Sequence, residues 1–383
     1  MPLSRCRYGA HLSKEQVAEL VAPHPHALDL VTSWLNHNGV PSSSISTTFG
    51  GGWLTITDVP VSQANRLLGA SYQLYGQAGT NDTTILRTVG YSLPAVLHRH
   101  VQTVVPTTCF ATTRAPRLWK TPRGRSVGEP GAPANAGLAG PGNVTSAHTG
   151  SRESELTVLS KRDVRILPAR LRSLYKTTTY IPAAIDENKL GVAGYLGQYP
   201  SPTDLRTFMW DYRDDAVAAA YTVEQINGGD YEMSHPGTEA NVDMQYAQAM
   251  AFPTPHIFYC TGGKIKRGPA GEGPAQGDMF LEWLKYMLDD KKDKPIPQTI
   301  STSYIAAERD LPREYTKALC DMYSRLGALG VSILFASGDS GVGPKNCDDG
   351  SGNVQFVPEF PASCMCGVLS SNAQNACTIP SRS

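Results

Sequence analysis

Several features that define common classes of protein are missing from this sequence. The 383 residues carry no net charge, with 34 basic and 34 acidic side chains, so no field that attracts nucleic acids or anionic membranes is indicated. No apolar run approaches the roughly 18 residues that span a membrane. The first residues contain no hydrophobic core of a signal peptide. Nucleic acids and membranes are therefore not expected partners.

The eight cysteines do not show the paired spacing of a zinc site. Cys364 and Cys366 stand too close together for that spacing. Structural disulfides in an oxidising compartment are the better interpretation, with Cys320, Cys347 and Cys364 as candidates and their pairing left open. Only 18% of the residues are charged, whereas 36 are glycine and 28 are proline. This composition predicts many turns and a modestly charged surface.

Residues 1–110 are predicted to form a small α+β domain. A cap residue at Ser13 and apolar residues at three- and four-residue steps predict helices over residues 12–37. A further helix is expected over Val61–Leu68, between strands over Trp53–Thr57 and Ser71–Tyr75. Helices interleaved with short strands in about a hundred residues are typical of an open α/β sandwich.

Residues 111–165 are predicted to be a flexible linker. Their central part is rich in arginine, proline, glycine, alanine and serine and shows no hydrophobic periodicity, so it cannot build a core. Such a segment is a natural place for proteolytic processing. An unremoved intervening sequence is an alternative origin that the sequence leaves open.

In residues 166–383, predicted strands alternate with predicted helices. The expected strands cover residues 189–196, 221–226, 255–261, 298–305 and 331–336, and the expected helices cover 202–212, 238–250, 277–288 and 312–327. Alternation of this kind implies crossover connections and a mostly parallel sheet. The fold class is therefore α/β, with a three-layer domain whose functional site lies at the carboxyl ends of the strands.

The last of these strands leads into the turn Ser337-Gly338-Asp339-Ser340-Gly341. Asp339 lies between two small residues at a sharp corner, which suits either a capping or a catalytic carboxyl. The same four letters, Gly-Asp-Ser-Gly, also occur in trypsin-like proteases. That alternative needs a histidine base, and none of the nine histidines stands in an Ala-Ala-His-Cys context.

Two further acids, Glu239 and Asp243, are four residues apart in the predicted helix over residues 238–250. This spacing places both carboxyls on one face, and Thr238 or Ser234 is expected to cap the helix. Two neighbouring carboxyls cannot both ionise without cost, so one keeps or shares a proton. A solvated helix face with two acids is the alternative interpretation.

Together, the acidic pair and the Ser-Gly-Asp-Ser-Gly turn resemble the sedolisins, the serine-carboxyl peptidases, and among them the fungal tripeptidyl-peptidase I-like enzymes. Three other segments are similar to family motifs in the family's order: Arg7–Val17 to the opening of the activation domain, Leu167–Tyr175 to the start of the mature enzyme, and Phe360–Cys364 to the segment after the oxyanion turn. The resemblance implies a subtilisin-like domain preceded by a pro-domain.

The resemblance also implies roles for the acids. Glu239 is expected to be the general base, Asp243 the acid that orients it, and Asp339 the oxyanion partner. Ser301, Ser303 and Tyr304 are expected to bind the substrate backbone, although ordinary polar residues of a strand would look the same. By resemblance the substrates are peptides or proteins, the pro-domain is the chain's own partner, the optimum is acidic, and the protein is secreted or extracellular.

The family's nucleophilic serine segment and the calcium loop that follows it are not found after residue 364. We therefore expect a chain truncated at both ends, with the C-terminal part of the peptidase domain missing and no activity of its own. Calcium is expected only in the complete family enzyme, and no metal site is predicted here. An alternative function is that the pro-domain acts as an inhibitor or binding module.

Overall fold

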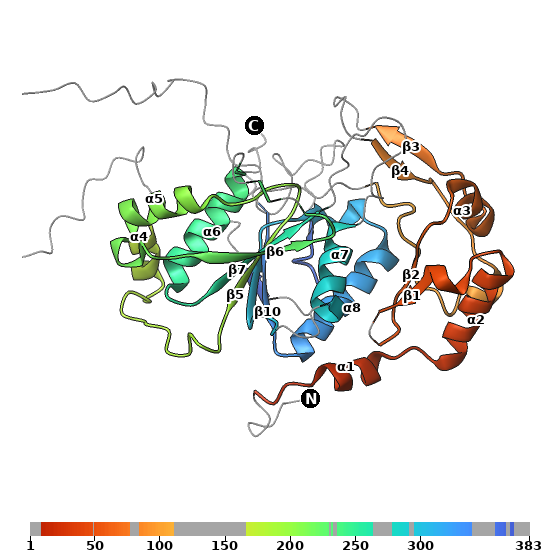
Figure 1. Cartoon of the computed structure of the whole chain (residues 1–383), viewed down its shortest axis with the longest axis horizontal. Helices are drawn as coiled ribbons and strands as arrows, with labels where there is room; N and C mark the ends of the chain where they lie inside the picture. The colour runs from red at the N-terminus through yellow and green to blue at the C-terminus, as the bar shows by residue number, and fades with distance from the viewer. Residues whose placement is uncertain are drawn as a thin grey trace, which may run out of the picture.

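The computed structural model describes residues 9–48, 50–76, 84–110, 166–229, 231–232, 236–262, 278–290, 295–338, 357–364 and 368–370. Within these ranges the chain forms a smaller N-terminal part, red to orange in Figure 1, and a larger part coloured green to blue. The predicted linker over residues 111–165 lies outside the described residues. The predicted boundaries of the domains stay a prediction.

The N-terminal part contains three helices and two antiparallel hairpins. Ser13 and Gln16 form the capping box that begins the first helix, as the sequence predicted, but the chain leaves that helix before a second one starts at Pro25. A small core of Val31, Leu35, Val40 and Leu97 lies between these elements. The elements are α1 (Lys14–Val21), α2 (Pro25–His37), β1 (Ile45–Thr47), β2 (Leu54–Ile56), α3 (Val61–Leu68), β3 (Gln73–Gly76) and β4 (Thr84–Arg87).

The larger part is built on a sheet of six described strands in the order β12-β10-β8-β5-β7-β6. Every neighbouring pair in this sheet is parallel. The strands are β5 (Leu190–Gly194), β6 (Tyr221–Ile226), β7 (His256–Thr261), β8 (Thr299–Thr302), β10 (Ser332–Ala336) and β12 (Val368–Ser370), and the helices are α4 (Pro168–Leu174), α5 (Pro202–Tyr212), α6 (Thr238–Ala251), α7 (Met279–Lys285) and α8 (Arg313–Ala328). The predicted parallel α/β domain is confirmed.

Both faces of the sheet are covered by helices, and the strand β7 shows this residue by residue. Phe258 and Cys260 belong to the core that α5 and α6 cover. Ile257 and Tyr259 belong to the core beneath α7 and α8. Side chains of a strand alternate between faces, so a continuously apolar strand fits a sheet buried on both sides. The three-layer, subtilisin-like architecture is therefore present (Figure 1).

The clearest differences from the predicted elements are at β8, at the helix predicted over residues 277–288, and after Cys364. β8 ends at Thr302 rather than at residue 305, so Ser303 and Tyr304 lie beyond the strand. The helix predicted over residues 277–288 is α-helical over Met279–Lys285 and continues as a π-helical turn, Tyr286–Asp290. The segment after Cys364, from which no family strand was expected, contributes β12, which pairs with β10.

A disulfide joins Cys320 in α8 to Cys364, with 5.4 Å between the Cα atoms. It uses two of the three cysteines predicted as candidates; Cys347 lies outside the described residues. Cys364 follows the short strand β11 (Glu359–Phe360), which pairs antiparallel with β9 (Ala306–Ala307). The disulfide therefore holds the segment after β11 against a helix of the core.

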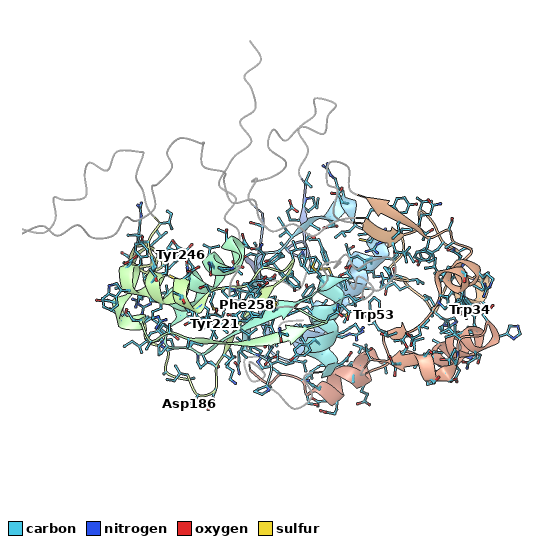
Figure 2. All side chains as sticks on the ribbon, turned by 45° about the horizontal axis from the view of Figure 1, so that its top comes forward. Trp34, Trp53, Asp186, Tyr221, Tyr246 and Phe258 are labelled. Atoms are coloured by element: carbon cyan, nitrogen blue, oxygen red, sulfur yellow. A yellow bond between two sulfur atoms is a disulfide. The ribbon has the colours of Figure 1, made fainter. Side chains whose placement is uncertain are left out.

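The N-terminal part contacts both ends of α8. The Leu12 N–H donates to the Ala328 carbonyl at 3.0 Å, and the Gln102 side chain donates to the Glu314 carbonyl at 3.5 Å. Trp53, labelled in Figure 2, and Val105 pack against the larger core. The predicted pro-domain thus lies on a helix of the larger domain and contributes apolar side chains to its packing.

Candidate functional site

The acidic helix α6 begins against the loop that follows β5. Gly237 precedes the first helical residue, and its N–H donates to the Tyr199 carbonyl at 2.9 Å. A Cβ at Gly237 would displace the end of the Gln198 side chain, so the loop passes close to the start of α6. The expected cap by Thr238 is wrong, because Thr238 is already helical and no side chain caps the helix. Ser234, the other expected cap, lies outside the described residues.

Asn241 fixes the rotation of α6 about its axis. Its Oδ1 accepts from the Ser201 N–H at 2.8 Å, and its Nδ2 donates to Asp204 Oδ2 at 2.7 Å. These bonds connect the first turn of α6 to the start of α5. Because residues on either side of Asn241 cannot rotate independently of it, Glu239 and Asp243 are held toward the interior.

The predicted acidic pair is brought to the carboxyl end of the sheet. Glu239 is buried, with 6% of its surface exposed, and Asp243 follows one turn later on the same face. Burial raises the pKa of Asp243 to about 7, although a hydrogen bond from Ser303 lowers it. The interpretation of a solvated acidic face is excluded for Glu239, since a solvated carboxylate is not buried to this degree.

Ser303 and Tyr304 meet this helix from the end of β8. Ser303 Oγ donates to Asp243 Oδ1 at 2.6 Å. Tyr304 is fully buried and stands edge-on to Tyr195, with 5.0 Å between ring centroids. Burial raises the pKa of the Tyr304 hydroxyl, and the nearby charges of Asp243 and Glu239 raise it further. Tyr304 therefore lies within electrostatic reach of both acids.

Two predicted site residues remain, Ser301 and Asp339, and only Ser301 lies among the described residues. Ser301 lies inside β8, half-buried, opposite Leu334 of β10 and Val192 of β5. Gly338 has a φ of +83°, and a Cβ there would approach Ile305 at 3.0 Å, so the chain leaving β10 passes the segment that follows β8. Asp339, the next residue, lies outside the described residues. Its role stays a prediction.

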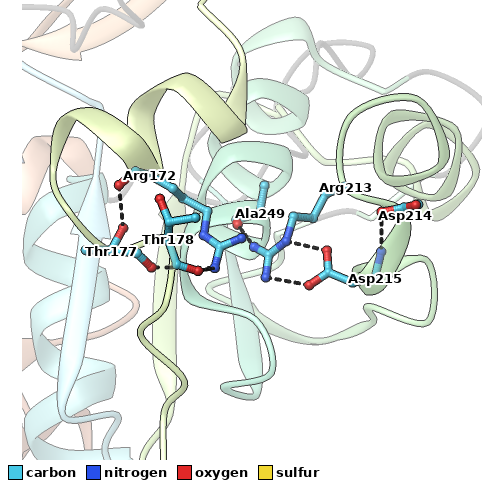
Figure 3. Close-up of polar contacts among 7 residues, drawn as sticks. All are labelled: Arg172, Thr177, Thr178, Arg213, Asp214, Asp215 and Ala249. Carbon is cyan, nitrogen blue, oxygen red and sulfur yellow. Dashed lines mark hydrogen bonds and ion pairs between the residues drawn. The ribbon is translucent and has the colours of Figure 1, made fainter. Parts of the chain in front are cut away.

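The opposite end of α6 carries a second charged group, which sequence reasoning did not single out. The buried Arg213 donates to the Ala249 carbonyl of α6 and, at 2.5 and 2.9 Å, to the two carboxylate oxygens of Asp215. Nearby, Arg172 donates to the Thr178 carbonyl at 2.7 Å. Figure 3 shows both guanidinium groups in this network. Their partners are backbone carbonyls and an exposed carboxylate, so this end is structural.

A calcium ion is not matched by the donors in the described ranges. No group of three or more histidine, cysteine, aspartate or glutamate side chains gathers there in a way that could hold a metal. Calcium therefore enters none of the steps proposed below.

Among the described helices, none combines the length and the apolar composition needed to cross a bilayer.

The fold and the site together define a subtilisin-like α/β protein with an acidic pair at the strand ends and a small N-terminal domain. Comparison with known families identifies that small domain: residues 3–110 match the family described as "Pro-kumamolisin, activation domain".

Curated relatives match over nearly the whole chain. Tripeptidyl-peptidase SED2 of Arthroderma otae is 31% identical over 370 residues, which cover 94% of this chain and 57% of that protein. Tripeptidyl-peptidase SED4 of the same organism is 32% identical over 369 residues, covering 93% and 55%. Probable tripeptidyl-peptidase SED3 of Arthroderma benhamiae is 31% identical over 365 residues, covering 93% and 56%. The chain thus spans little more than half the length of these relatives.

A solved structure, Pseudomonas sedolisin (serine-carboxyl proteinase) complexed with two molecules of pseudo-iodotyrostatin, is 15% identical with a TM-score of 0.38, covering 53% of this chain and 52% of that one. That likeness is too low to support an argument about geometry. Residues 3–110 thus match a pro-kumamolisin activation domain, and nearly the whole chain is similar to fungal tripeptidyl-peptidases.

Proposed function

We propose that this chain carries the proton-handling part of a secreted serine-carboxyl peptidase that removes tripeptides from free N-termini at acid pH. The observation that carries the proposal is the acidic pair of α6: Glu239 is buried, Asp243 is half-buried with a shielded Oδ2, and desolvation raises the pKa of Asp243 to about 7. The names of the fungal relatives support the tripeptidyl-peptidase class. Peptides and proteins are the proposed substrates.

In the proposed mechanism the two acids have different protonation states. Glu239, ionised, takes the proton of a serine nucleophile as that hydroxyl attacks the peptide carbonyl. Asp243, neutral below about pH 7, donates a hydrogen bond that orients Glu239 and stabilises its charge. Glu239 then returns the proton to the leaving amine. Asp339 is proposed to donate, as a neutral acid, to the oxyanion.

The remaining proposed roles lie at the end of β8. Ser301, Ser303 and Tyr304 are proposed to present this end of the strand to a substrate backbone. The serine nucleophile is not assigned to any described residue. We therefore expect turnover only from a protein in which a serine completes this site, called the whole protein below.

The test is a tripeptide with a free N-terminus joined to a fluorogenic leaving group. We expect release of the group by the whole protein at acid pH, with activity lost as the pH rises through about 7, where Asp243 ionises. The same peptide with a blocked N-terminus serves as the matched control and is expected to be inert. Turnover that is unchanged at alkaline pH, or turnover of the blocked peptide, would contradict the proposal.

A second candidate function is inhibition by the N-terminal part. Its own core of Val31, Leu35, Val40 and Leu97 and its contacts with both ends of α8 fit a domain that binds the peptidase half. Added in excess to an active sedolisin, residues 1–110 are expected to reduce turnover. Unchanged turnover would remove this candidate without affecting the first.

A further inference from the structure

Ser303 joins the end of a central strand to the acidic helix. It is the first residue after β8, whereas Asp243 lies in the second turn of α6, and 60 residues separate the two in sequence. Their hydrogen bond, from Ser303 Oγ to Asp243 Oδ1, measures 2.6 Å. That length is typical of hydroxyl donors to carboxylates, which are among the stronger hydrogen bonds of proteins.

The bond makes the two oxygens of Asp243 inequivalent. Oδ1 is occupied as an acceptor of the Ser303 proton, whereas Oδ2 is shielded from solvent and has no hydrogen-bond partner among the described residues. A carboxyl whose Oδ1 already accepts a proton carries its own proton on Oδ2. With Ser303 as the donor to Oδ1, a neutral Asp243 therefore carries its own proton on the buried Oδ2.

Glu239 lies one turn before Asp243 on the same face of α6. Asn241, between the two acids in the helix, is bound to Ser201 and Asp204 and so keeps both acids on the inner face. Tyr304 follows Ser303 directly and lies near both acids. The rotation of α6 and the orientation of the Asp243 carboxyl are thus fixed by different residues, Asn241 and Ser303.

We propose that Ser303 is a positioning residue, whose hydroxyl holds the Asp243 carboxyl in one orientation and directs its proton, on Oδ2, toward Glu239. The inference rests on the proposed function for the role of Glu239 as the base. It gives the Ser303 side chain a task distinct from binding a substrate backbone.

The test follows the titration of Asp243 in the intact 383-residue chain, by NMR with ¹³C-labelled aspartate carboxyls. The signal of Asp243 is assigned by its loss in Asp243→Asn. Removing a hydrogen bond to the ionised carboxylate disfavours ionisation, so Ser303→Ala is expected to raise the pKa of Asp243 by about one to two pH units above the wild-type value. Ser303→Thr keeps the hydroxyl and is expected to titrate like the wild type.

Ser324→Ala is the matched control. Ser324 is also half-buried and also donates one hydrogen bond, to the Cys320 carbonyl at 2.8 Å, but it lies in α8. We expect this variant to leave the titration of Asp243 unchanged. An unchanged titration in Ser303→Ala, or an equal change in Ser324→Ala, would overturn the proposal. If Ser303→Ala does not fold, Ser303→Cys, with its weaker donor, takes its place with the same expected direction.

The titration needs no turnover, which separates this inference from the proposed function. A raised pKa in Ser303→Ala together with an inactive whole protein would support the positioning role and contradict the peptidase. Activity of the whole protein with an unmoved pKa would contradict the positioning role alone. In the active protein we also expect Ser303→Ala to lower kcat more than it changes KM, a split that lost substrate binding would not produce.

Discussion

Charged side chains at the two ends of α6 differ in their hydrogen-bond pairing and in the direction in which their pKa values are shifted. At the C-terminal end, the guanidinium of Arg213 meets the Ala249 carbonyl and both oxygens of Asp215, and the bond from Arg213 lowers the pKa of Asp215. At the N-terminal end, Asp243 has one oxygen without a partner among the described residues, and burial raises its pKa to about 7. Complete pairing stabilises a fold, whereas an incompletely paired buried acid is poised to exchange a proton.

The largest expected effect is the loss of activity when the base at the N-terminal end of α6 is removed. Glu239→Gln keeps the shape of the buried side chain but removes the base, so the activity of the whole protein toward the fluorogenic tripeptide is expected to fall by about 10²- to 10⁴-fold. Circular dichroism and the melting temperature are expected to stay near those of the wild type. A variant that keeps its full activity would show that Glu239 is not the base.

The next effect concerns stability and pH at Asp243. The folded protein holds this proton more tightly than the unfolded chain does, since burial raises the pKa from 3.8 to about 7. The stabilising contribution is therefore fully present below about pH 4 and is lost as the pH rises through about 7, a change of about 4 kcal/mol.

Asp243→Asn has no such proton to lose. In urea titrations of the 383-residue chain, we expect the free energy of unfolding of the wild type to fall relative to Asp243→Asn over this pH range. Asp215→Asn, near the other end of α6, is the control: it keeps Asp243, so the wild type is not expected to lose stability relative to it over this pH range. Parallel pH curves for the wild type and Asp243→Asn would contradict the raised pKa.

At the C-terminal end of α6, substitutions are expected to change the free energy of unfolding by a smaller amount and to leave catalysis unaffected. Arg213→Met is expected to lower the free energy of unfolding by about 2 to 3 kcal/mol, because the buried Ala249 carbonyl loses a charged donor. Asp215→Asn is expected to cost less than about 1 kcal/mol, since the Asp215 side chain is 60% exposed. Equal losses in the two variants would mean that the ion pair, rather than the carbonyl, carries the contribution.

The smallest expected effect comes from His256, at the start of β7. Burial lowers the pKa of this histidine below 6.5, so the unfolded chain binds a proton that the folded protein rejects. Its contribution to stability is present above about pH 6.5 and declines as the pH falls, opposite in direction to that of Asp243. His256→Asn is expected to flatten the acid side of the stability curve; a steeper acid side would show that His256 is protonated in the fold.

The contrast between the two ends of α6 also shows what local sequence can predict. The Glu-x-x-x-Asp spacing and the alternation of strands and helices were sufficient to predict α6, the parallel sheet and the position of both acids on one helix face; the burial of Glu239 was not predicted. α3 (Val61–Leu68) and β6 (Tyr221–Ile226) were predicted with their observed bounds, because apolar periodicity acts over a few neighbouring residues.

Other features depend on residues that are distant in the chain. The bond from Ser303 to Asp243 spans 60 residues, and the pairing of Cys320 with Cys364 spans 44. A pattern among neighbouring residues does not indicate which distant residue a side chain contacts. The strands β4 and β9, of four and two residues, were not predicted. The end of β8 was misplaced because Tyr304 and Ile305 are residue types that favour strands, although the ladder ends at Thr302.

The most direct measurement is the midpoint at which the Asp243 carboxyl titrates in the intact chain, read from its ¹³C NMR signal. A midpoint at about pH 7 is predicted for a buried acid that keeps its proton beside Glu239. A midpoint near 4, the ordinary value for a solvated aspartate, would contradict the proton-handling pair.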